Sequence, residues 1–239
     1  MKQVSERPTP TQISQKSGFS AAFLFMAVLF VVCLIASNLY ASKIFSVFGF
    51  ILPGAVIIFP VSYILNDCLS EVYGYRKARL VIWMGFLLNF FFVLMSQLVL
   101  ILPPADFWDG ADAFNMVFGS TPRAAVASLL AFLAGSTINA FVMSRMKVKD
   151  QGRKFSSRAI LSSLAGEAAD SAIFIPIMFW SIGLHDILKM MIVQVIAKVL
   201  YEIVILPITG RVVAKVKEIE QTDVYDTDIS YNPFRISDF

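Results

Sequence analysis

The sequence predicts an all-α membrane protein that crosses the bilayer six times, with both termini in the cytoplasm. Of its 239 residues, 57% are hydrophobic and only 15% charged, and the mean hydropathy is +0.72. Soluble domains have about 45–50% apolar and about 25% charged residues, so this composition belongs to the membrane class. The apolar residues form six runs of about 19–24 residues, the length that crosses a bilayer core as a helix.

We expect one membrane domain between two polar tails. Residues 1–18 are polar, with two prolines and several Ser and Thr, and are predicted to be a disordered cytoplasmic tail. Residues 19–217 form the six-helix transmembrane domain, and residues 218–239 form a polar cytoplasmic tail. The first apolar run is longer than a signal-peptide core and more spans follow it, so it is expected to be retained as a helix.

The six spans show local features that shape their helices. Their expected bounds are 19–37, 50–73, 81–102, 124–143, 159–182 and 187–209. Pro60 predicts a kink in the second span, seven residues before Asp67. The small residues Ala134, Gly135 and Ser136 in the fourth span allow close helix approach in lipid.

Basic residues set the orientation. The connections after the second and fourth spans and both tails carry sixteen Lys and Arg, whereas the other connections carry three. Such a bias places the basic side and both termini in the cytoplasm. The connection after the third span is acidic, with Asp106, Asp109 and Asp112, and its Phe107 and Trp108 suit a membrane interface.

Polar residues interrupt the second span at or near membrane depth. Asn66, Asp67 and Glu71 follow an apolar stretch, and the two acids are four residues apart, so they share one helix face. A carboxylate at the bilayer centre costs about 2.5–3.5 kcal/mol on insertion scales, so it usually faces a cavity or a partner. The alternative is a helix that ends early, with both acids among lipid headgroups.

The fifth and sixth spans also carry charged residues. Glu167 and Asp170 are three apart on one face, with Pro176 following. Lys198 and Glu202 are four apart on one face. They could simply neutralise each other within the helix, but even such a pair is costly against lipid, so this face is expected to point inward.

The interior is unbalanced in charge. Five acids stand against one amine: Asp67, Glu71, Glu167, Asp170 and Glu202 against Lys198. Desolvation and like-charge repulsion oppose ionisation of all five. Either some carry protons, or a cationic or donor-rich ligand joins them.

Other classes of site have no support in the sequence. Cys33 and Cys68 lie in apolar spans without metal or disulfide spacing, and His185 is the single histidine. HExxH, GxSxG and P-loop motifs are missing, so the chain is not expected to be an enzyme, to hold a metal or cofactor, or to hydrolyse ATP itself.

Four motifs carry a resemblance to a known family. They are FPVSYILNDCLSEVYGYRKAR at 59–79, SNLYASKI before it, GEAADSAIF in the fifth span and KVLYEIVILP in the sixth. With its D-x-x-x-E-x-Y-G-Y-x-x-A-R arrangement, the chain resembles the queuosine precursor transporters, bacterial inner-membrane proteins related to the vitamin-uptake transporters. This resemblance implies import of 7-cyano-7-deazaguanine, 7-aminomethyl-7-deazaguanine or queuine, which supply the queuosine modification of transfer RNA.

The chemistry of such a ligand matches the acid-rich interior. A deazaguanine presents a ring N–H beside an exocyclic amine, and one carboxylate can accept both hydrogen bonds. We expect Glu167 and Asp170, with Asp67 or Glu71 across a cavity, to hold the base, while Lys198 and Glu202 orient them. The remaining edge would pair with one of three amides: Asn38, Asn66 or Asn139. Arg79 ends the motif, and an anchor to lipid headgroups is an equal alternative for it.

The sequence predicts the binding partners and leaves the oligomeric state and the energy coupling open. The expected partners are a small purine-like base and the lipid bilayer, with no direct nucleic-acid contact. A homodimer is left open, since no span shows a clean GxxxG seam. Proton coupling is also open. The alternative function is a substrate-binding membrane subunit that needs a separate ATPase, for a vitamin-like small molecule.

Four aromatic residues lie near polar positions and are candidates for stacking on a ligand: Tyr63, Trp83, Trp180 and Tyr201.

Overall fold

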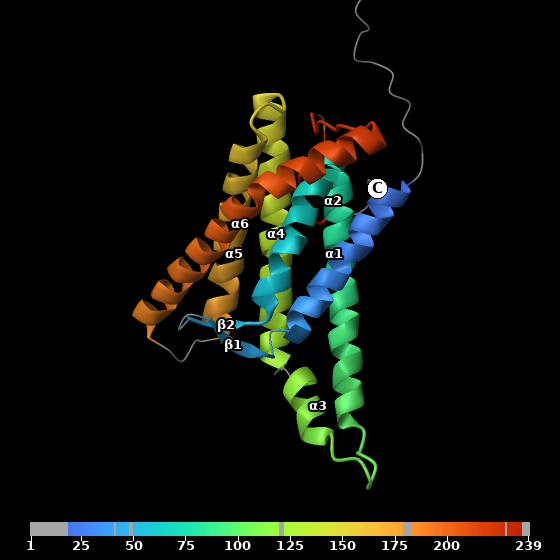
Figure 1. The fold of residues 1–239 in the computed structure, drawn as a ribbon, viewed down its shortest axis with the longest axis vertical. Coiled ribbons are helices and arrows are strands. Elements are labelled where there is room, and N and C mark those ends of the chain that lie inside the picture. Colours follow the sequence, from blue (N-terminus) through green and yellow to red (C-terminus); the bar gives the residue numbers. More distant parts are fainter. Residues whose placement is uncertain are drawn as a thin grey trace, which may run out of the picture.

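The computed structural model shows a bundle of long helices (Figure 1). It describes residues 19–40, 42–47, 50–119, 122–178, 183–227 and 229–235, so the predicted tail 1–18 and Trp180 lie outside the described residues. The elements are α1 (Ala21–Tyr40), β1 (Ile44–Val47), β2 (Phe50–Pro53), α2 (Ala55–Ile101), α3 (Ala111–Phe118), α4 (Pro122–Asp150), α5 (Phe155–Met178) and α6 (Leu184–Glu220). Five of these described helices, all but α3, are long and apolar enough to cross a membrane. The expectation of a helical multi-pass membrane protein is confirmed.

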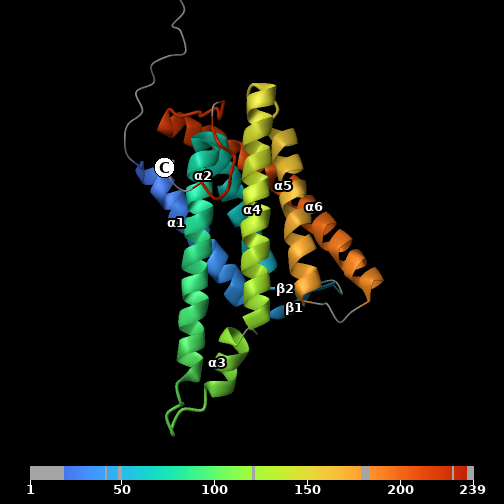
Figure 2. The same ribbon diagram turned by 180° about the vertical axis from the view of Figure 1, so that it is seen from behind.

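Helix α2 contains two of the expected spans. Its dihedral angles are helical except at Gly74, where φ is 82° and ψ is 170°. Figures 1 and 2 show the first arm (55–73) running toward one end of the bundle and the second arm (75–101) returning. The backbone therefore turns at Gly74, while Pro60, where we expected the kink, keeps helical angles. This path agrees with six crossings and cytoplasmic termini, which remain predictions.

A two-stranded hairpin was not expected in this helical fold. Strands β1 and β2 pair antiparallel, with Ile44 opposite Pro53 and Val47 opposite Phe50. The Gly54 N–H then donates to the Lys43 carbonyl at 2.7 Å and closes the hairpin before α2 begins. Pairing satisfies backbone groups that an apolar segment too short for a spanning helix would otherwise leave exposed to lipid.

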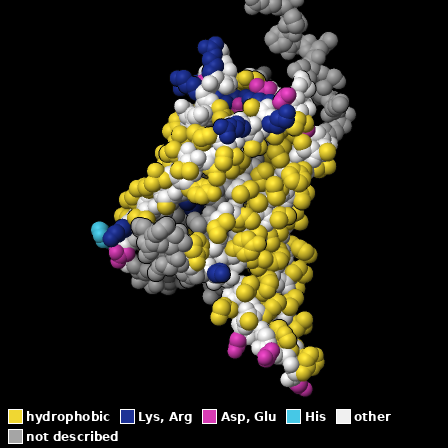
Figure 3. All heavy atoms as spheres, viewed as in Figure 1, with side chains coloured by type: hydrophobic (Ala, Val, Ile, Leu, Met, Phe, Trp, Pro, Cys, Tyr) yellow, Lys and Arg dark blue, Asp and Glu magenta, His cyan; other side chains and the backbone are white. Residues whose placement is uncertain are grey.

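Charged residues gather at the two ends of the bundle. Figure 3 shows an apolar belt, with Lys and Arg mainly at the end where the C-terminal end of α6 and the α4–α5 turn lie. The opposite tip, formed by the end of α2 and by α3, is acidic and contains Asp106, Asp109 and Asp112. This distribution agrees with the orientation predicted from the basic residues, since the basic end of a membrane protein faces the cytoplasm.

The C-terminal segment folds back over the Gly74 turn. The Val224 N–H donates to the Val72 carbonyl at 3.1 Å. The Trp83 indole N–H donates to the Pro233 carbonyl at 2.8 Å, and Arg79 donates to the Asn232 carbonyl at 2.6 Å. Arg79 is only 1% exposed, so its alternative role as a lipid-headgroup anchor is wrong.

Replacing Gly74 with alanine should destabilise the protein by about 1–3 kcal/mol, because this backbone conformation is essentially restricted to glycine. The added Cβ would also lie 2.7 Å from the Asp226 Oδ1 and 2.8 Å from the Val224 Cγ1, and would push the C-terminal segment away. Thermal unfolding of the purified protein in detergent measures the effect. Gly210→Ala is the matched control: its Cβ would meet only Phe155 at 4.0 Å, so its Tm should be unchanged or slightly raised. Equal Tm values for wild type and Gly74→Ala would contradict this role of the turn.

Candidate functional site

Polar side chains from four helices meet inside the bundle. We call this group the central cluster, and most of its members are buried. It comprises Tyr63, Asn66 and Asp67 of α2, Ser136 and Asn139 of α4, Ser163, Glu167 and Asp170 of α5, and Lys198 and Glu202 of α6. Seven of the nine predicted binding residues are therefore close together, and the exceptions are Asn38 and Glu71.

Lys198 joins α6 to α5 within the central cluster. Its Nζ lies 2.5 Å from the Glu167 Oε2 and 2.9 Å from the Asp170 Oδ2. The two acids share one face of α5, as their spacing predicts. Lys198 thus pairs with acids of another helix, and the alternative that it merely neutralises Glu202 within α6 is wrong. Tyr63 of α2 lies beside Glu167.

Two asparagines connect α2, α4 and α5. The Asn66 Nδ2 donates to the Asn139 Oδ1 at 2.9 Å and to the Ser136 carbonyl at 3.4 Å. The Asn139 Nδ2 in turn donates to the Ser163 Oγ at 3.2 Å. Buried amides need such partners, because an unmade hydrogen bond costs about 1–3 kcal/mol. The network fixes how the three helices lie around the acids.

Close packing of α4 against α5 positions these residues. A Cβ on Gly166 would lie 2.8 Å from the Gly135 carbonyl oxygen and 3.0 Å from the Asn139 Cβ. A Cβ on Gly135 would lie 3.1 Å from the Asp170 Cβ. The expectation that small residues near Gly135 permit close helix approach is confirmed. Larger side chains here would separate Asn139 from α5.

Glu71 belongs to a second cluster nearer the basic end of the bundle. Its Oε1 lies 2.7 Å from the Arg158 Nη2 of α5, 2.7 Å from the Lys217 Nζ of α6 and 4.0 Å from the Lys147 Nζ of α4. Arg158 is fully buried and also pairs with Asp150 at 2.8 Å. We call these five residues the Glu71 cluster. Because three cations surround Glu71, it ties four helices together rather than adding to the negative charge of the central cluster.

The C-terminal segment is held to the Glu71 cluster. The Asp223 Oδ1 lies 2.5 Å from the Lys147 Nζ and 2.9 Å from the Lys217 Nζ. Burial raises the pKa of Asp223, but hydrogen bonds from the two lysines outweigh burial and hold this pKa below its usual value. The ion pairs therefore persist at neutral pH, and they would be lost only as the pH falls through the lowered pKa of Asp223.

Asn38 lies in a separate polar group. Its Nδ2 donates to the Asn89 Oδ1 at 2.9 Å, and its Oδ1 accepts from the Ser128 hydroxyl at 3.2 Å. These bonds join α1, α2 and α4, and within the described ranges no hydrogen bond links Asn38 with the acids of the central cluster. Of the aromatic candidates, Tyr63 lies in the central cluster, while Trp83 is engaged by the C-terminal segment.

The space beside the central cluster is small. A cavity of about 10 Å³ lies among Phe30, Tyr63, Asn66 and Ser136, among others. This is about the volume that one water needs, so a bicyclic base does not fit without helix movement. The structure therefore brings the acids together in a closed conformation.

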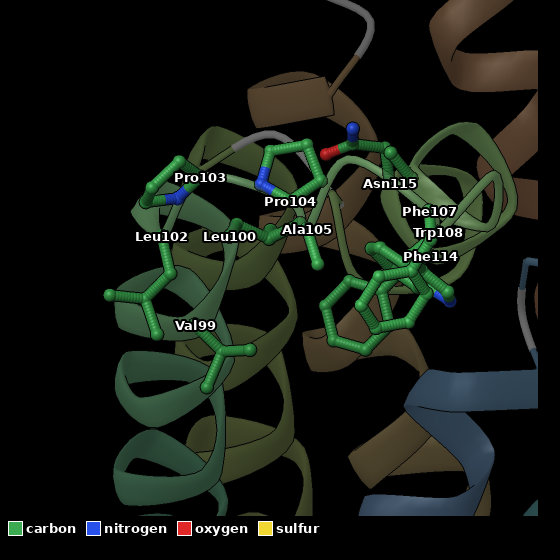
Figure 4. A pocket seen from close by; sticks show the side chains of 11 residues that line it. Val99, Leu100, Leu102, Pro103, Pro104, Ala105, Phe107, Trp108, Phe114 and Asn115 are labelled. Atoms are coloured by element: carbon green, nitrogen blue, oxygen red, sulfur yellow. The ribbon is translucent and has the colours of Figure 1, made fainter.

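A larger groove lies far from these acids. Its volume is about 360 Å³, and it is formed at the acidic tip by the end of α2 and by α3 (Figure 4). The lining is mostly apolar and includes Leu102, Pro103, Phe107, Trp108 and Phe114. Exposed Trp and Phe are typical of the membrane interface, which agrees with the expected role of this connection.

Sequence reasoning missed the residues whose partners are distant in the chain. Ser163 looks like an ordinary small residue of a span, and its bond to Asn139 joins two helices. Arg158 and Lys217 were counted among the cytoplasmic basic residues. Hydropathy does not distinguish a buried arginine at a helix end from an exposed one in a connection.

A bundle of apolar helices around a buried cluster of acids and amides is the architecture of a membrane transporter. Residues 53–212 match the family described as "Putative vitamin uptake transporter", and the chain belongs to this family. It is 30% identical over 176 residues to "Probable queuosine precursor transporter" of Bacillus subtilis (strain 168), covering 71% of this chain and 74% of that protein. It is 25% identical over 167 residues to "Queuosine precursor transporter" of Escherichia coli (strain K12), covering 70% of this chain and 72% of that protein. No solved structure matches the chain.

These comparisons confirm the family resemblance. The protein is a multi-pass transporter of the bacterial inner membrane and not an enzyme. The matched residues include all of α2, α4 and α5 and most of α6, so they contain the central cluster.

Glu71→Gln should lower the free energy of unfolding by about 3 kcal/mol, because losing one partner of a buried ion pair leaves uncompensated charge. Here Arg158 and the two lysines would lose their shared carboxylate. Chemical or thermal unfolding in detergent measures the change. Glu218→Gln is the matched control, since Glu218 is exposed and pairs only with exposed Lys215 on the surface of α6. A Glu71→Gln protein with wild-type stability would contradict this structural role.

Proposed function

We propose that this protein imports queuosine precursors across the bacterial inner membrane. The observation that carries the proposal is the central cluster: four carboxylates and one lysine, buried between helices of a chain whose relatives are named queuosine precursor transporters. Its substrates are 7-cyano-7-deazaguanine, 7-aminomethyl-7-deazaguanine and queuine, which feed the queuosine modification of transfer RNA.

Glu167 and Asp170 bind the base in this proposal. A carboxylate can accept the ring N–H and the exocyclic amine of a deazaguanine together. Lys198 orients both acids, since its ammonium group lies within 2.9 Å of each. The side-chain amides of Asn66 and Asn139 offer donors and acceptors to the rest of the base.

Transport requires the central cluster to open. The cavity of about 10 Å³ beside it has room for roughly one water, whereas ligand pockets measure about 300–1,000 Å³. Helix α6 is suited to move, because it packs mainly against α5 and only four of its residues are buried: Ile187, Glu202, Thr209 and Val213. Separation of α6 from α5 would part Lys198 from Glu167 and Asp170 and open an acid-lined cavity between the helices.

Restored queuosine synthesis tests the proposed function. In a bacterial strain that cannot make deazaguanines and lacks its own importer, expression of this protein should restore queuosine in transfer RNA when a precursor is supplied at low concentration. The compound that restores it identifies the substrate. Failure with all three compounds, despite confirmed membrane expression, would count against this substrate class. Uptake by the purified protein alone in liposomes would exclude the alternative of a binding subunit that needs a separate ATPase.

Asp170→Asn and Glu167→Gln should each reduce precursor uptake at least tenfold, since losing a charged hydrogen bond costs about 1.5–3 kcal/mol. Uptake of labelled precursor into cells measures this, with membrane expression checked in parallel. Asp112→Asn is the matched control, because Asp112 lies in α3 at the acidic tip, away from the central cluster. Normal uptake by both α5 variants would refute the assignment of these residues.

A further inference from the structure

Two carboxyl groups of the central cluster, those of Asp67 and Glu202, stand apart from the ion pairs that the described residues form. Lys198 pairs with Glu167 and Asp170. The cations of the Glu71 cluster, Arg158 and Lys217, pair with Glu71. Within the described ranges, neither Asp67 nor Glu202 forms an ion pair. Asp67 is 1% exposed and Glu202 8%, and each keeps one oxygen without a hydrogen-bond partner, Oδ1 and Oε1 respectively.

The two acids lie where α2 and α6 pack against each other. Asp67 is on α2 and Glu202 on α6, and the two carboxyl groups lie within Coulombic range of each other. Beside them, the hydrogen bonds of Asn66, Asn139 and Ser163 join α2, α4 and α5. The two carboxyl groups therefore form one unit between α2 and α6, with two free oxygens on which a proton can reside.

In the described part of the chain, the cations nearest to this pair are already bound to other acids. From α2 the pair faces Tyr63, Cys68 and Glu71. The charge of Glu71 is already paired with Arg158 and Lys217. From α5 it faces Glu167 and Asp170, which share Lys198 of α6. From α4 the neutral Asn139 lies beside it, and Lys147 lies two helical turns further along and is bound to Asp223.

Closure around two ionised carboxylates would be costly. An isolated buried charge loses its hydration, and the usual outcome is neutralisation by a proton or a partner. The closed conformation, with space for roughly one water, therefore needs a neutral carboxyl group in the pair.

We propose that Asp67 and Glu202 share one proton and that this proton enters the cell with each substrate molecule. The inference rests on the proposed function and adds its energy source. A proton from external water binds a carboxylate oxygen of the pair while the cluster is open outward. The neutralised pair permits closure, and the same proton leaves to cytoplasmic water after inward opening. No bond other than the carboxyl O–H forms or breaks.

The first test uses the full-length protein purified into liposomes loaded with a pH-sensitive dye. With the interior made alkaline and the membrane potential clamped at zero, labelled precursor should accumulate above the external concentration. The limit for one proton per substrate is about tenfold for each unit of pH difference. Addition of precursor should also acidify the interior. A sodium gradient without a pH difference should drive no accumulation.

Glu202→Gln is the informative variant, because glutamine has the shape of the protonated acid but cannot release a proton. It should lose pH-driven accumulation and acidification, and any exchange of labelled for unlabelled precursor that remains should no longer depend on pH. Asp67→Asn should behave in the same way. Glu218→Gln, further along α6 and exposed, is the matched control and should keep wild-type coupling. Infrared spectroscopy gives a readout without substrate: the wild type should show a buried protonated carboxyl band that Glu202→Gln or Asp67→Asn removes.

The outcomes separate this inference from the proposed function. Exchange of precursor without acidification or pH-driven accumulation in the wild type would overturn proton coupling and leave the transport function intact. Accumulation driven by sodium alone would overturn it as well. Absence of any exchange would refute the transport function and the coupling that rests on it. Persistence of the infrared band in both variants would place the proton elsewhere.

Discussion

The structure depends on the need to compensate charge that is buried within a membrane bundle. A charged side chain away from water is tolerated only with a partner, and breaking a buried pair costs about 3–5 kcal/mol. Glu71 meets this condition through three cations from three other helices. Lys198 meets it through two acids of α5. Apolar helix surfaces gain little from burial against one another in lipid. These ion pairs therefore help to hold the helices together.

The two clusters have different consequences for function. The Glu71 cluster is balanced by cations and joined to the C-terminal segment through Asp223, so it ties α2, α4, α5 and α6 together at the basic end of the bundle. The central cluster has more acids than cations and includes two carboxyl groups without an ion pair among the described residues. Fully compensated charge favours a rigid structure, whereas an uncompensated group favours binding of a proton or ligand.

Backbone geometry makes both clusters possible. Gly135 of α4 and Gly166 of α5 let the two helices approach very closely. A Cβ on either glycine would come too close to the carbonyl oxygen of the other. Asn139 can then reach Ser163, and the amide network closes. Gly74 turns α2 back on itself, so that its first arm carries Asn66 and Asp67 and its second arm carries Arg79. Arg79 in turn holds the returning C-terminal segment.

The sequence alone determined the membrane class, the helical spans and most of the candidate site. The composition and length of the apolar runs determine the membrane class and the spans, because a span must be apolar and about 20 residues long. Acids within such an apolar run, such as Glu167 and Asp170, are easily recognised as candidate site residues. Sequence did not determine the partners. Lys198 pairs with Glu167 and Asp170 of α5 rather than with Glu202, Glu71 pairs with Arg158 and Lys217, and α2 keeps helical angles at Pro60, where a kink was expected. Only the tertiary structure decides these, because the partner of a buried charge comes from a different helix, and spacing along one helix carries no information about which helix lies opposite.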